Sequence, residues 1–271
     1  MKERLPASMF TGEPLNLQTR QPPGSSAGEW VVAGQEHEEP ISASQFENLP
    51  APVRRYLTAV IPENRRRVRR ARFTQSGVFR VGEEVEKWQP FTAEQDVVTN
   101  PPGFVWSATI RMGPLLSVRV MDAYQNGCGI LRARLLGVVP VANASGPEMD
   151  EGEMMRYLAE AIWYPTALVP DGRLSWRPVD ESSALAVLSD KGREVSVKFR
   201  FDNQGMIYRI DADRFRAQNG GYRRRPWSAY CGEYALRDGF RIPLEARVVW
   251  HFPQLELEYF RGRIESAEYD A

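Results

Sequence analysis

Residues 103–139 read GFVWSATIRMGPLLSVRVMDAYQNGCGILRARLLGVV. Three runs rich in β-branched and aromatic residues, GFVWSATIRM, LLSVRVMDAY and GILRARLLGVV, are separated only by turn residues at Gly113-Pro114 and Asn126-Gly127. Such dipeptides favour tight turns, and short runs joined by tight turns are typical of antiparallel strands. This stretch therefore predicts a β-meander.

The meander extends along the chain in both directions. In RRARFTQSGVFR, Ala71, Phe73 and Phe79 share one face, while Arg70 and Arg72 take the other, as in a strand. After an interruption at 148–164, runs of the same kind resume, with tight links at 190–192, 203–205 and 237–239. The further strand candidates are KWQPFTAEQDVV, RLSWRPVD, SALAVLSD, EVSVKFRFD, MIYRIDADRFRA, WSAYCGEYAL, FRIPLEARVVWHF and LELEYFRGRIESAEY. The run Arg223-Arg224-Arg225 is expected in a loop before Pro226-Trp227.

About a dozen strands without alternating helices predict an antiparallel sheet, and a sheet of that size must curl, split or close. The expected fold class is α+β, with one large curved antiparallel sheet, a half-barrel or cup, and two main helices. One helix lies within LPAPVRRYLTAVIPEN, where Val53, Tyr56, Leu57 and Val60 form an apolar face. The other, at 148–164, is expected on the concave side.

Two segments differ in composition. Residues 1–40 are rich in Pro, Gly, Ser, Gln and Glu, which predicts a disordered or loosely ordered N-terminal segment. Residues 41–271 are predicted to form a single β-rich domain. Neither the N-terminus, MKERLPASMF, nor any later apolar run has the pattern of a signal peptide or membrane span, so a cytoplasmic location without a transmembrane segment is expected.

The net charge and the motifs in the sequence limit the classes of function that can be expected. The chain has 35 basic and 35 acidic residues, and this neutrality gives no reason to expect nucleic acid as a partner. Its two cysteines, Cys128 and Cys231, are far apart in sequence and are expected to be free thiols. No cluster of metal ligands is present, so neither a metal nor a cofactor is predicted.

Catalytic motifs are weak. The residues at 24–28, GSSAG, match the nucleophile elbow of hydrolases, but no strand precedes them and the match is discounted. Of the two histidines, His37 lies in the polar N-terminal segment and His251 in a strand pattern. The prediction is that no residue is catalytic, which favours a non-catalytic protein.

The helix at 148–164 carries the most informative pattern. Wound as a helix, EMMRYLAEAIWYP (153–165) gathers Glu153, Arg156 and Glu160 in a stripe opposite a broad apolar side. Trp163 borders the stripe on one edge, with Tyr157 and Tyr164 on the other. A solvent-facing stripe needs no bulky aromatic borders, so this one is expected to be covered and to face the cup. Asp122, Tyr124 or Ser175 could be tied to it, and Asp150 with Glu153 fits a capping box.

Three interpretations of the stripe stay open: a structural network, a polar surface that contacts a ligand, and an acid/base pair. Each tryptophan on a predicted strand, taken alone, is best explained by packing in the core. Several of them together could instead line a cavity. The candidate ligand-binding residues are Glu153, Arg156, Tyr157, Glu160, Trp163, Asp122, Trp88, Trp106 and Trp176.

Several blocks resemble an uncharacterised bacterial family, a domain of unknown function. They are LPAPVRRYL, KWQPFTAEQ, GFVWSATIRMGP, RYLAEAIWYPTAL, LSWRPVD and IPLEARVVW, and the resemblance spans roughly 49–268. The family implies no activity and no catalytic residue. Its members often carry hydrophobic N-terminal segments, from which this polar N-terminus departs. The shape it implies is similar to the curved sheet of LolA-like lipoprotein carriers.

The leading hypothesis is a binder of an apolar or amphipathic small molecule in the curved sheet, with Arg156, Glu153 and Glu160 orienting a polar group at its mouth. The first alternative is a carboxylate-dependent hydrolase or isomerase using Glu153 or Glu160 beside a second carboxylate. The second is a protein-interaction module that uses a sheet edge or the arginine run at 65–72.

Overall fold

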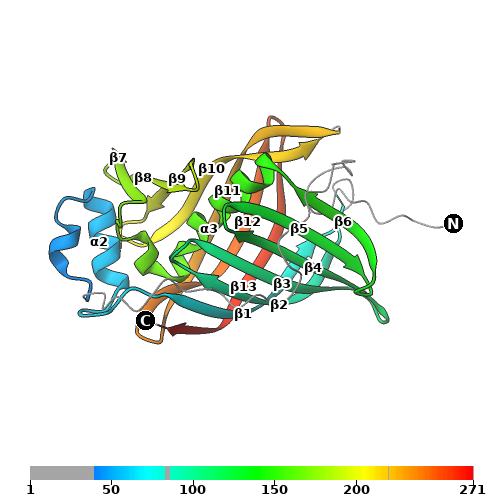
Figure 1. Cartoon of the computed structure of the whole chain (residues 1–271), viewed down its shortest axis with the longest axis horizontal. Helices are drawn as coiled ribbons and strands as arrows, with labels where there is room; N and C mark the ends of the chain where they lie inside the picture. Colours follow the sequence, from blue (N-terminus) through cyan, green and yellow to red (C-terminus); the bar gives the residue numbers. More distant parts are fainter. Residues whose placement is uncertain (1–39, 83–85, 219, 271) are drawn as a thin grey trace.

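The computed structural model of the chain describes residues 40–82, 86–218 and 220–270. These residues form a 13-stranded sheet in which all paired neighbours are antiparallel, in the order β6-β5-β4-β3-β2-β1-β13-β12-β11-β10-β9-β8-β7 (Figure 1). The strands are β1 (Arg70–Arg80), β2 (Trp88–Val98), β3 (Gly103–Gly113), β4 (Leu116–Gln125), β5 (Cys128–Leu135), β6 (Val139–Ser145), β7 (Leu174–Asp180), β8 (Ser183–Asp190), β9 (Arg193–Phe201), β10 (Ile207–Gln218), β11 (Gly221–Arg237), β12 (Phe240–Phe252) and β13 (Leu255–Asp270). The helices are η1 (Ala43–Phe46), α2 (Ala51–Val60), α3 (Pro147–Glu160), η2 (Ala161–Trp163) and η3 (Pro165–Leu168).

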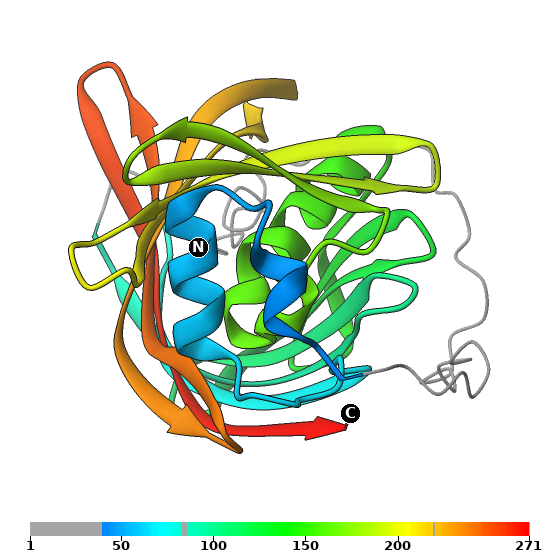
Figure 2. The same cartoon turned by 90° about the vertical axis from the view of Figure 1, so that its left-hand side faces the viewer.

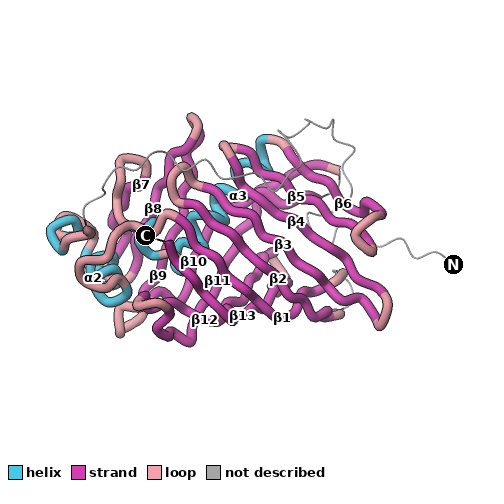
Figure 3. The backbone as a smooth tube through the Cα atoms, turned by 60° about the horizontal axis from the view of Figure 1, so that its bottom comes forward, coloured by secondary structure: helices cyan, strands magenta, loops and turns pink. Residues whose placement is uncertain are grey.

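The sheet is strongly curved and wraps around α3, while α2 covers one end of the concave space (Figure 2). The predicted fold class, a large curved antiparallel sheet with two main helices, is confirmed. Strand pairing links elements far apart in sequence, because β1 pairs with β13 at the centre of the sheet, from Arg70 opposite Asp270 to Phe79 opposite Phe260. The tube view shows β6 and β7 toward the two ends of the sheet (Figure 3).

Helix α2 forms where the sequence indicates. Pro52 lies in the first turn, where its missing N–H costs no intrahelical hydrogen bond. Val53, Tyr56, Leu57 and Val60 are all buried, so the predicted apolar face is the face that packs. This helix contacts β12 and β8.

Helix α3 is buried on most of its circumference, since Met154, Met155, Leu158 and Ala159 and also Glu153 and Tyr157 are buried. It ends at Glu160, and the chain continues through two 3-10 turns, so the predicted helix over 148–164 is four residues too long at its C-terminus. The capping-box prediction is wrong. Gly146 precedes the helix, and Asp150 instead accepts a hydrogen bond from the backbone N–H of Gly129 at 2.8 Å.

Gly129 positions this helix against the sheet. A Cβ atom at residue 129 would lie 2.2 Å from the backbone oxygen of Met149, far inside van der Waals contact. Only glycine lets β5 approach the first turn of α3 this closely. The start of α3 is therefore fixed to β5 by backbone packing and by the Asp150 hydrogen bond.

Two strand boundaries differ from the sequence-based prediction. The run at 129–139 is split, because β5 ends at Leu135 and a turn leads into β6, a strand that was not predicted. Leu136 and Gly137 adopt positive φ in that turn. The run Arg223-Arg224-Arg225, expected in a loop, lies inside β11 opposite Phe215 and its neighbours on β10.

The arginine run at 65–72 is used within the fold. Arg65 pairs with Asp238 at 3.0 Å and Arg72 with Asp96 at 2.7 Å. Arg67 donates to the carbonyl oxygens of Thr166, Val169 and Pro170. At least three of the six arginines in the run therefore have partners within the protein.

Two predictions fall outside the described residues: the disordered segment at 1–40, apart from residue 40, and the GSSAG motif at 24–28. None of the helices within the described ranges combines the length and apolar character needed to cross a bilayer.

Candidate functional site

A cavity of about 200 Å³, partly open to solvent, lies between α3 and the concave face of the sheet. Aromatic side chains from η2, β3, β11, β12 and β13 contribute much of its wall: Trp163, Trp106, Trp227, Trp250, Tyr259 and Phe260. Charged side chains from α3, β4 and β10 also line it, among them Asp122, Glu153, Arg156, Glu160 and Arg214. The cavity thus joins an apolar wall to a compact polar cluster.

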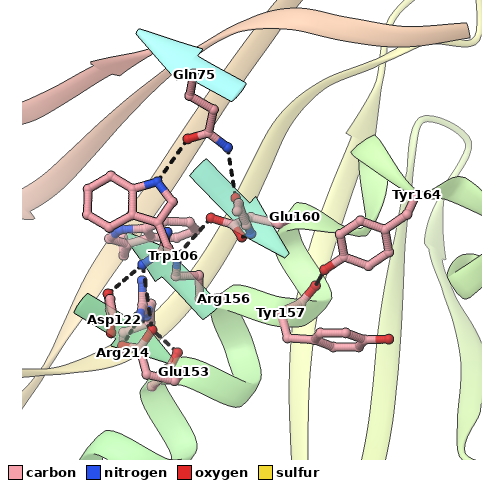
Figure 4. Close-up of polar contacts among 12 residues, drawn as sticks. Gln75, Trp106, Asp122, Glu153, Arg156, Tyr157, Glu160, Tyr164 and Arg214 are labelled. Atoms are coloured by element: carbon pink, nitrogen blue, oxygen red, sulfur yellow. Dashed lines mark hydrogen bonds and ion pairs between the residues drawn. The ribbon is translucent and has the colours of Figure 1, made fainter. Parts of the chain in front are cut away.

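Arg156 is the centre of this cluster (Figure 4). Its Nε donates to Glu160 at 2.7 Å, and its Nη1 donates to Asp122. The guanidinium carbon also lies 4.8 Å from the ring centroid of Phe104 and 5.2 Å from that of Trp106. Two carboxylates and two aromatic rings around one cation fix its position.

A chain of hydrogen bonds ties Glu160 to the sheet. The indole N–H of Trp106 donates to Gln75, the amide of Gln75 donates to Gln95, and the amide of Gln95 donates to Glu160, at 2.9, 2.7 and 2.6 Å. The chain crosses β3, β1 and β2 before it reaches α3. Arg156 and Glu160 therefore belong to a structural network that holds α3 on the sheet.

Asp122, Glu153 and Arg214 are less completely paired. Arg214 donates from Nη2 to the backbone oxygen of Gly152 at 2.8 Å and lies 3.6 Å from Glu153 Oε1. Within the described residues, three buried atoms of this group have no hydrogen-bond partner: Asp122 Oδ1, Glu153 Oε2 and Arg214 Nε. Glu153 Oε2 does lie 3.9 Å from Arg156 Nη1, in a longer ion pair. Because buried polar atoms are nearly always hydrogen-bonded, these three atoms are the least completely paired part of the cluster.

The Glu153 carboxyl group has an unusual protonation equilibrium. Burial, together with the negative charge of Asp122, raises its pKa to about 8, although Arg214 and Arg156 oppose the shift. Burial also raises the pKa of Asp122, against the effect of Arg156. At neutral pH Glu153 is therefore mostly a neutral acid that can donate a proton or a hydrogen bond.

The predicted binding residues divide into two groups. Six of them line the cavity: Asp122, Glu153, Arg156, Glu160, Trp106 and Trp163. The lining does not include the other three, which lie elsewhere in the fold: Tyr157, Trp88 and Trp176.

Each of these three side chains has its own packing role. Tyr157 is buried against Tyr164, with ring centroids 5.5 Å apart. Trp88 donates to Glu86 and lies under the guanidinium of Arg261. Trp176 packs on Phe199 and donates to the backbone oxygen of Leu168. Of the other partners expected for the stripe, Tyr124 donates instead to Asp190, and Ser175 is exposed on β7.

Sequence reasoning missed Arg214, along with the cavity wall formed by β11 to β13. A signal was available in IYRIDADRFRAQ: counting in steps of two from the buried Ile210 puts Arg214 and Arg216 on the core face of β10. Both arginines are buried and lie over aromatic rings, Arg214 over Trp227 and Arg216 over Trp250. An arginine in phase with buried residues thus indicated an inward-facing charge.

Other reactive side chains do not form a second centre among the described residues. No group of three or more His, Cys, Asp or Glu side chains there could hold a metal ion. His251 lies between Glu256 and Ser228 on the sheet. Both cysteines are free, and burial raises the pKa of Cys231, which lines the cavity, to about 12, so its thiol stays protonated.

Comparison with known proteins gives a family but no activity. The model of a family of unknown function (DUF6920) matches residues 47–269. No curated protein matches the sequence.

Among solved structures, a LolA superfamily protein from Nitrosomonas europaea is 8% identical, with 85% of this chain and 94% of that one covered at a TM-score of 0.37. A β-barrel-like protein of the domain of unknown function DUF1849 from Brucella abortus is also 8% identical, with 76% and 99% covered at a TM-score of 0.29. Likenesses this distant carry no information about what the chain binds.

Proposed function

This chain belongs to the family of unknown function DUF6920, and we propose from its cavity that it is a non-catalytic binder of an apolar or amphipathic small molecule. One observation carries the proposal: the aromatic cavity is lined by Asp122, Glu153 and Arg214, and each of these side chains has a buried polar atom without a hydrogen-bond partner among the described residues. An apolar wall with a few convergent polar groups is the usual character of a small-molecule site.

The wall suits the apolar part of such a molecule. A cavity of about 150 Å³ lined by aliphatic and aromatic side chains is known to admit benzene in another protein. The cavity here measures about 200 Å³ and is partly open. It has room for a ring or a short chain, and a longer molecule can extend outward.

The polar cluster favours an uncharged head group. With Glu153 protonated, Asp122 and Glu160 balance the charges of Arg156 and Arg214. An added ion would then be buried without a counter-charge, which is costly. A hydroxyl group can donate to Asp122 Oδ1 or Glu153 Oε2 and accept from Arg214 Nε, so it can pair with two of these three atoms at once.

The polar group is therefore assigned to Asp122, Glu153 and Arg214. Arg156 and Glu160 have their hydrogen bonds within the protein, so they support the site without needing the ligand. The sequence-based hypothesis gave Arg156 the orienting role, and the proposal transfers that role to Arg214.

Binding of the neutral fluorescent dye N-phenyl-1-naphthylamine tests the proposal. The dye should be displaced by 1-decanol more strongly than by decanoate or decylamine. Ala246→Phe, which places a ring in the cavity, should abolish binding, whereas Ala59→Phe on the exposed face of α2 should not. Equal dye binding by wild type and Ala246→Phe would show that the dye is not in the cavity. Mass spectrometry of an organic extract of the purified protein would identify a ligand that co-purifies.

A second candidate function is proton-transfer catalysis, as in a hydrolase or isomerase. The observation that favours it is the pairing of a buried Glu153, whose pKa is about 8, with Asp122 in an accessible cavity. Glu160 already accepts hydrogen bonds from Gln95 and Arg156. The second carboxylate of the proposed acid/base pair is therefore Asp122. A general acid with a pKa near the working pH is well placed for such chemistry.

Glu153→Gln separates the two functions. Binding of the neutral dye should survive this near-isosteric change, while acid/base turnover of a panel of p-nitrophenyl esters and glycosides should be lost. Turnover that is equal in the wild type and in Glu153→Gln would remove the catalytic candidate and leave the binding proposal standing.

A further inference from the structure

Two neighbouring hairpins of the sheet end in exposed apolar residues. Leu115 lies in the turn between β3 and β4, and Leu116 is the first residue of β4. Leu136 and Val138 lie in the turn between β5 and β6, and Val139 is the first residue of β6. Leu115 is 92% exposed and Val138 is 72% exposed. The backbone N–H of Leu136 donates to Ser117 at 2.8 Å, which joins the two hairpins side by side. Single exposed apolar residues are ordinary, but five on adjacent tips form a patch.

The strands that carry these tips are basic on their outer face. Arg111, Arg119, Arg132 and Arg134 alternate with buried residues on β3, β4 and β5, so their side chains lie on the convex side. Arg119 is directly opposite Arg134 in the pairing of β4 with β5. Like charges placed opposite each other destabilise a sheet unless something neutralises them.

Among the residues that the structure describes, no acidic side chain on β3, β4, β5 or β6 neutralises those arginines. Residues 97–121 and 123–147 contain no Asp or Glu, and the one acid between them, Asp122, lines the cavity on the other face. Within the described residues, none of these four arginines takes part in an ion pair or a side-chain hydrogen bond. In contrast, Arg72, Arg261 and Arg263 on the central strands all pair with carboxylates.

We propose that the hairpin-tip surface (Leu115, Leu116, Leu136, Val138 and Val139 with Arg111, Arg119, Arg132 and Arg134) docks on an anionic phospholipid bilayer. The apolar tips would enter the boundary between head groups and acyl chains, and the guanidinium groups would bind lipid phosphates. The complementarity of charge favours lipid over another protein, because each arginine is attracted to an anionic leaflet whatever its arrangement.

The hairpin-tip surface lies at the end of the sheet where the end of β1 lines the cavity. Because neighbouring strands are antiparallel, the C-terminal ends of β1, β3 and β5 meet at one end of the sheet, and Phe79, Arg80 and Gly82 at the end of β1 line the cavity. In Figure 1 the turn between β3 and β4 and the turn between β5 and β6 lie toward the right, away from α2. The docking proposal rests on the hairpins alone and stands whether or not the cavity binds a small molecule.

Flotation of the full chain with vesicles tests the proposal. Vesicles of phosphatidylcholine alone are compared with vesicles of phosphatidylcholine and phosphatidylglycerol at a 7:3 ratio, in 50 and 500 mM NaCl. Wild type should bind the anionic vesicles at least tenfold more tightly than the neutral ones, and high salt should weaken the binding. Failure to bind either kind of vesicle, or equal binding to both, would overturn the proposal.

Paired variants assign the effect to this surface. Arg119→Gln with Arg134→Gln should weaken binding about 25-fold, at about fivefold for each arginine. The control, Arg66→Gln with Arg177→Gln, removes the same charge from exposed positions elsewhere and should change binding less than twofold. An equal loss in both pairs would indicate a non-specific charge effect and would contradict the assignment.

A second pair of double variants tests the contribution of the apolar tips to membrane binding. Leu115→Ser with Val138→Ser should reduce binding to anionic vesicles at least tenfold, while Val179→Ser with Leu236→Ser, which are also exposed, should not. Sedimentation of the same proteins tests whether the patch instead binds a second copy of this chain. A dimer lost specifically in Leu115→Ser with Val138→Ser would mean that the patch binds a second copy, and the membrane proposal would fail. Ala246→Phe, which fills the cavity, should float with vesicles as the wild type does.

Discussion

Replacing Glu153 with glutamine should make the protein more stable, and by an amount that grows with pH. The folded pKa of Glu153 is about 8, against an ordinary value of 4.5 that applies to the unfolded chain. Below pH 4.5 both states hold the proton, so the wild type has its full stability. Between pH 4.5 and 8 the unfolded state releases the proton first, and the free energy of unfolding falls as pH rises.

The magnitude follows from the shift in pKa. One pKa unit corresponds to about 1.4 kcal/mol, so the loss reaches about 3 kcal/mol at pH 7 and about 5 kcal/mol above pH 8. Glutamine has nearly the shape and hydrogen-bonding capacity of the neutral acid but does not titrate. Relative to the wild type, Glu153→Gln should therefore be nearly neutral at pH 4.5 and stabilising by several kcal/mol at pH 8.

Urea unfolding of both proteins at pH 4.5, 6, 7 and 8.5 measures this difference. Glu94→Gln, at an exposed position of β2, controls for the loss of one carboxylate from the chain. A difference in the free energy of unfolding between Glu153→Gln and wild type that stays constant within about 1 kcal/mol from pH 4.5 to 8.5 would refute the reasoning. Glu153 would then be ionised in the folded protein and balanced by Arg214 and Arg156.

Three further substitutions test the packing around α3 by their effect on the free energy of unfolding. Arg156→Met leaves Asp122 and Glu160 buried without their cation and should cost about 3–5 kcal/mol, whereas Arg72→Met breaks an exposed pair and should have little effect. Trp106→Phe keeps a ring but removes the donor to Gln75, and should cost about 1–2 kcal/mol, more than Trp88→Phe, whose indole bonds to exposed Glu86. Gly129→Ala forces a Cβ atom against Met149 and should cost about 1–3 kcal/mol, while Gly113→Ala meets open space and should be tolerated. Equal effects in a variant and its control would contradict the corresponding contact.

Local patterns were enough to predict the fold class. Period-two runs and tight turns identified most strands, because burial on one face of a sheet imposes alternation on the sequence. The same logic missed β6: VPVANAS has little apolar contrast between its faces, and only one of its residues is buried. It also placed Arg223 to Arg225 in a loop, because three adjacent charged residues suggest a solvent-exposed segment. In the structure these residues lie within the long strand β11, paired with β10.

The site was predictable only where one helix carried it. Glu153, Arg156 and Glu160 follow from helical spacing, and the aromatic borders indicated that the stripe was covered. The partners of that stripe come from strands up to 65 residues away, such as Gln95 for Glu160. Which strand faces which side chain depends on sheet curvature and register, and the periodicity of a single element contains neither.

A purely structural role would account for only part of the polar cluster. Arg156, Glu160, Gln95, Gln75 and Trp106 form a connected set that anchors α3. Unpartnered buried atoms also occur elsewhere, for example Tyr56 Oη, so one such atom does not define a site. Three such atoms, however, belong to ionisable side chains that line the cavity and approach one another, and burying them incompletely paired costs stability.

Apolar residues of similar volume would remove that cost and could still fill the space beside α3. The anchoring network does not need Asp122 Oδ1, Glu153 Oε2 or Arg214 Nε, because its hydrogen bonds run through other atoms. A ligand that pairs with these three atoms would recover the lost hydrogen bonds on binding. Binding and stability should then be linked: a molecule that fits should raise the melting temperature of the wild type by more than that of Glu153→Gln with Arg214→Met. Equal shifts in the two proteins would mean that the polar cluster contributes nothing to recognition.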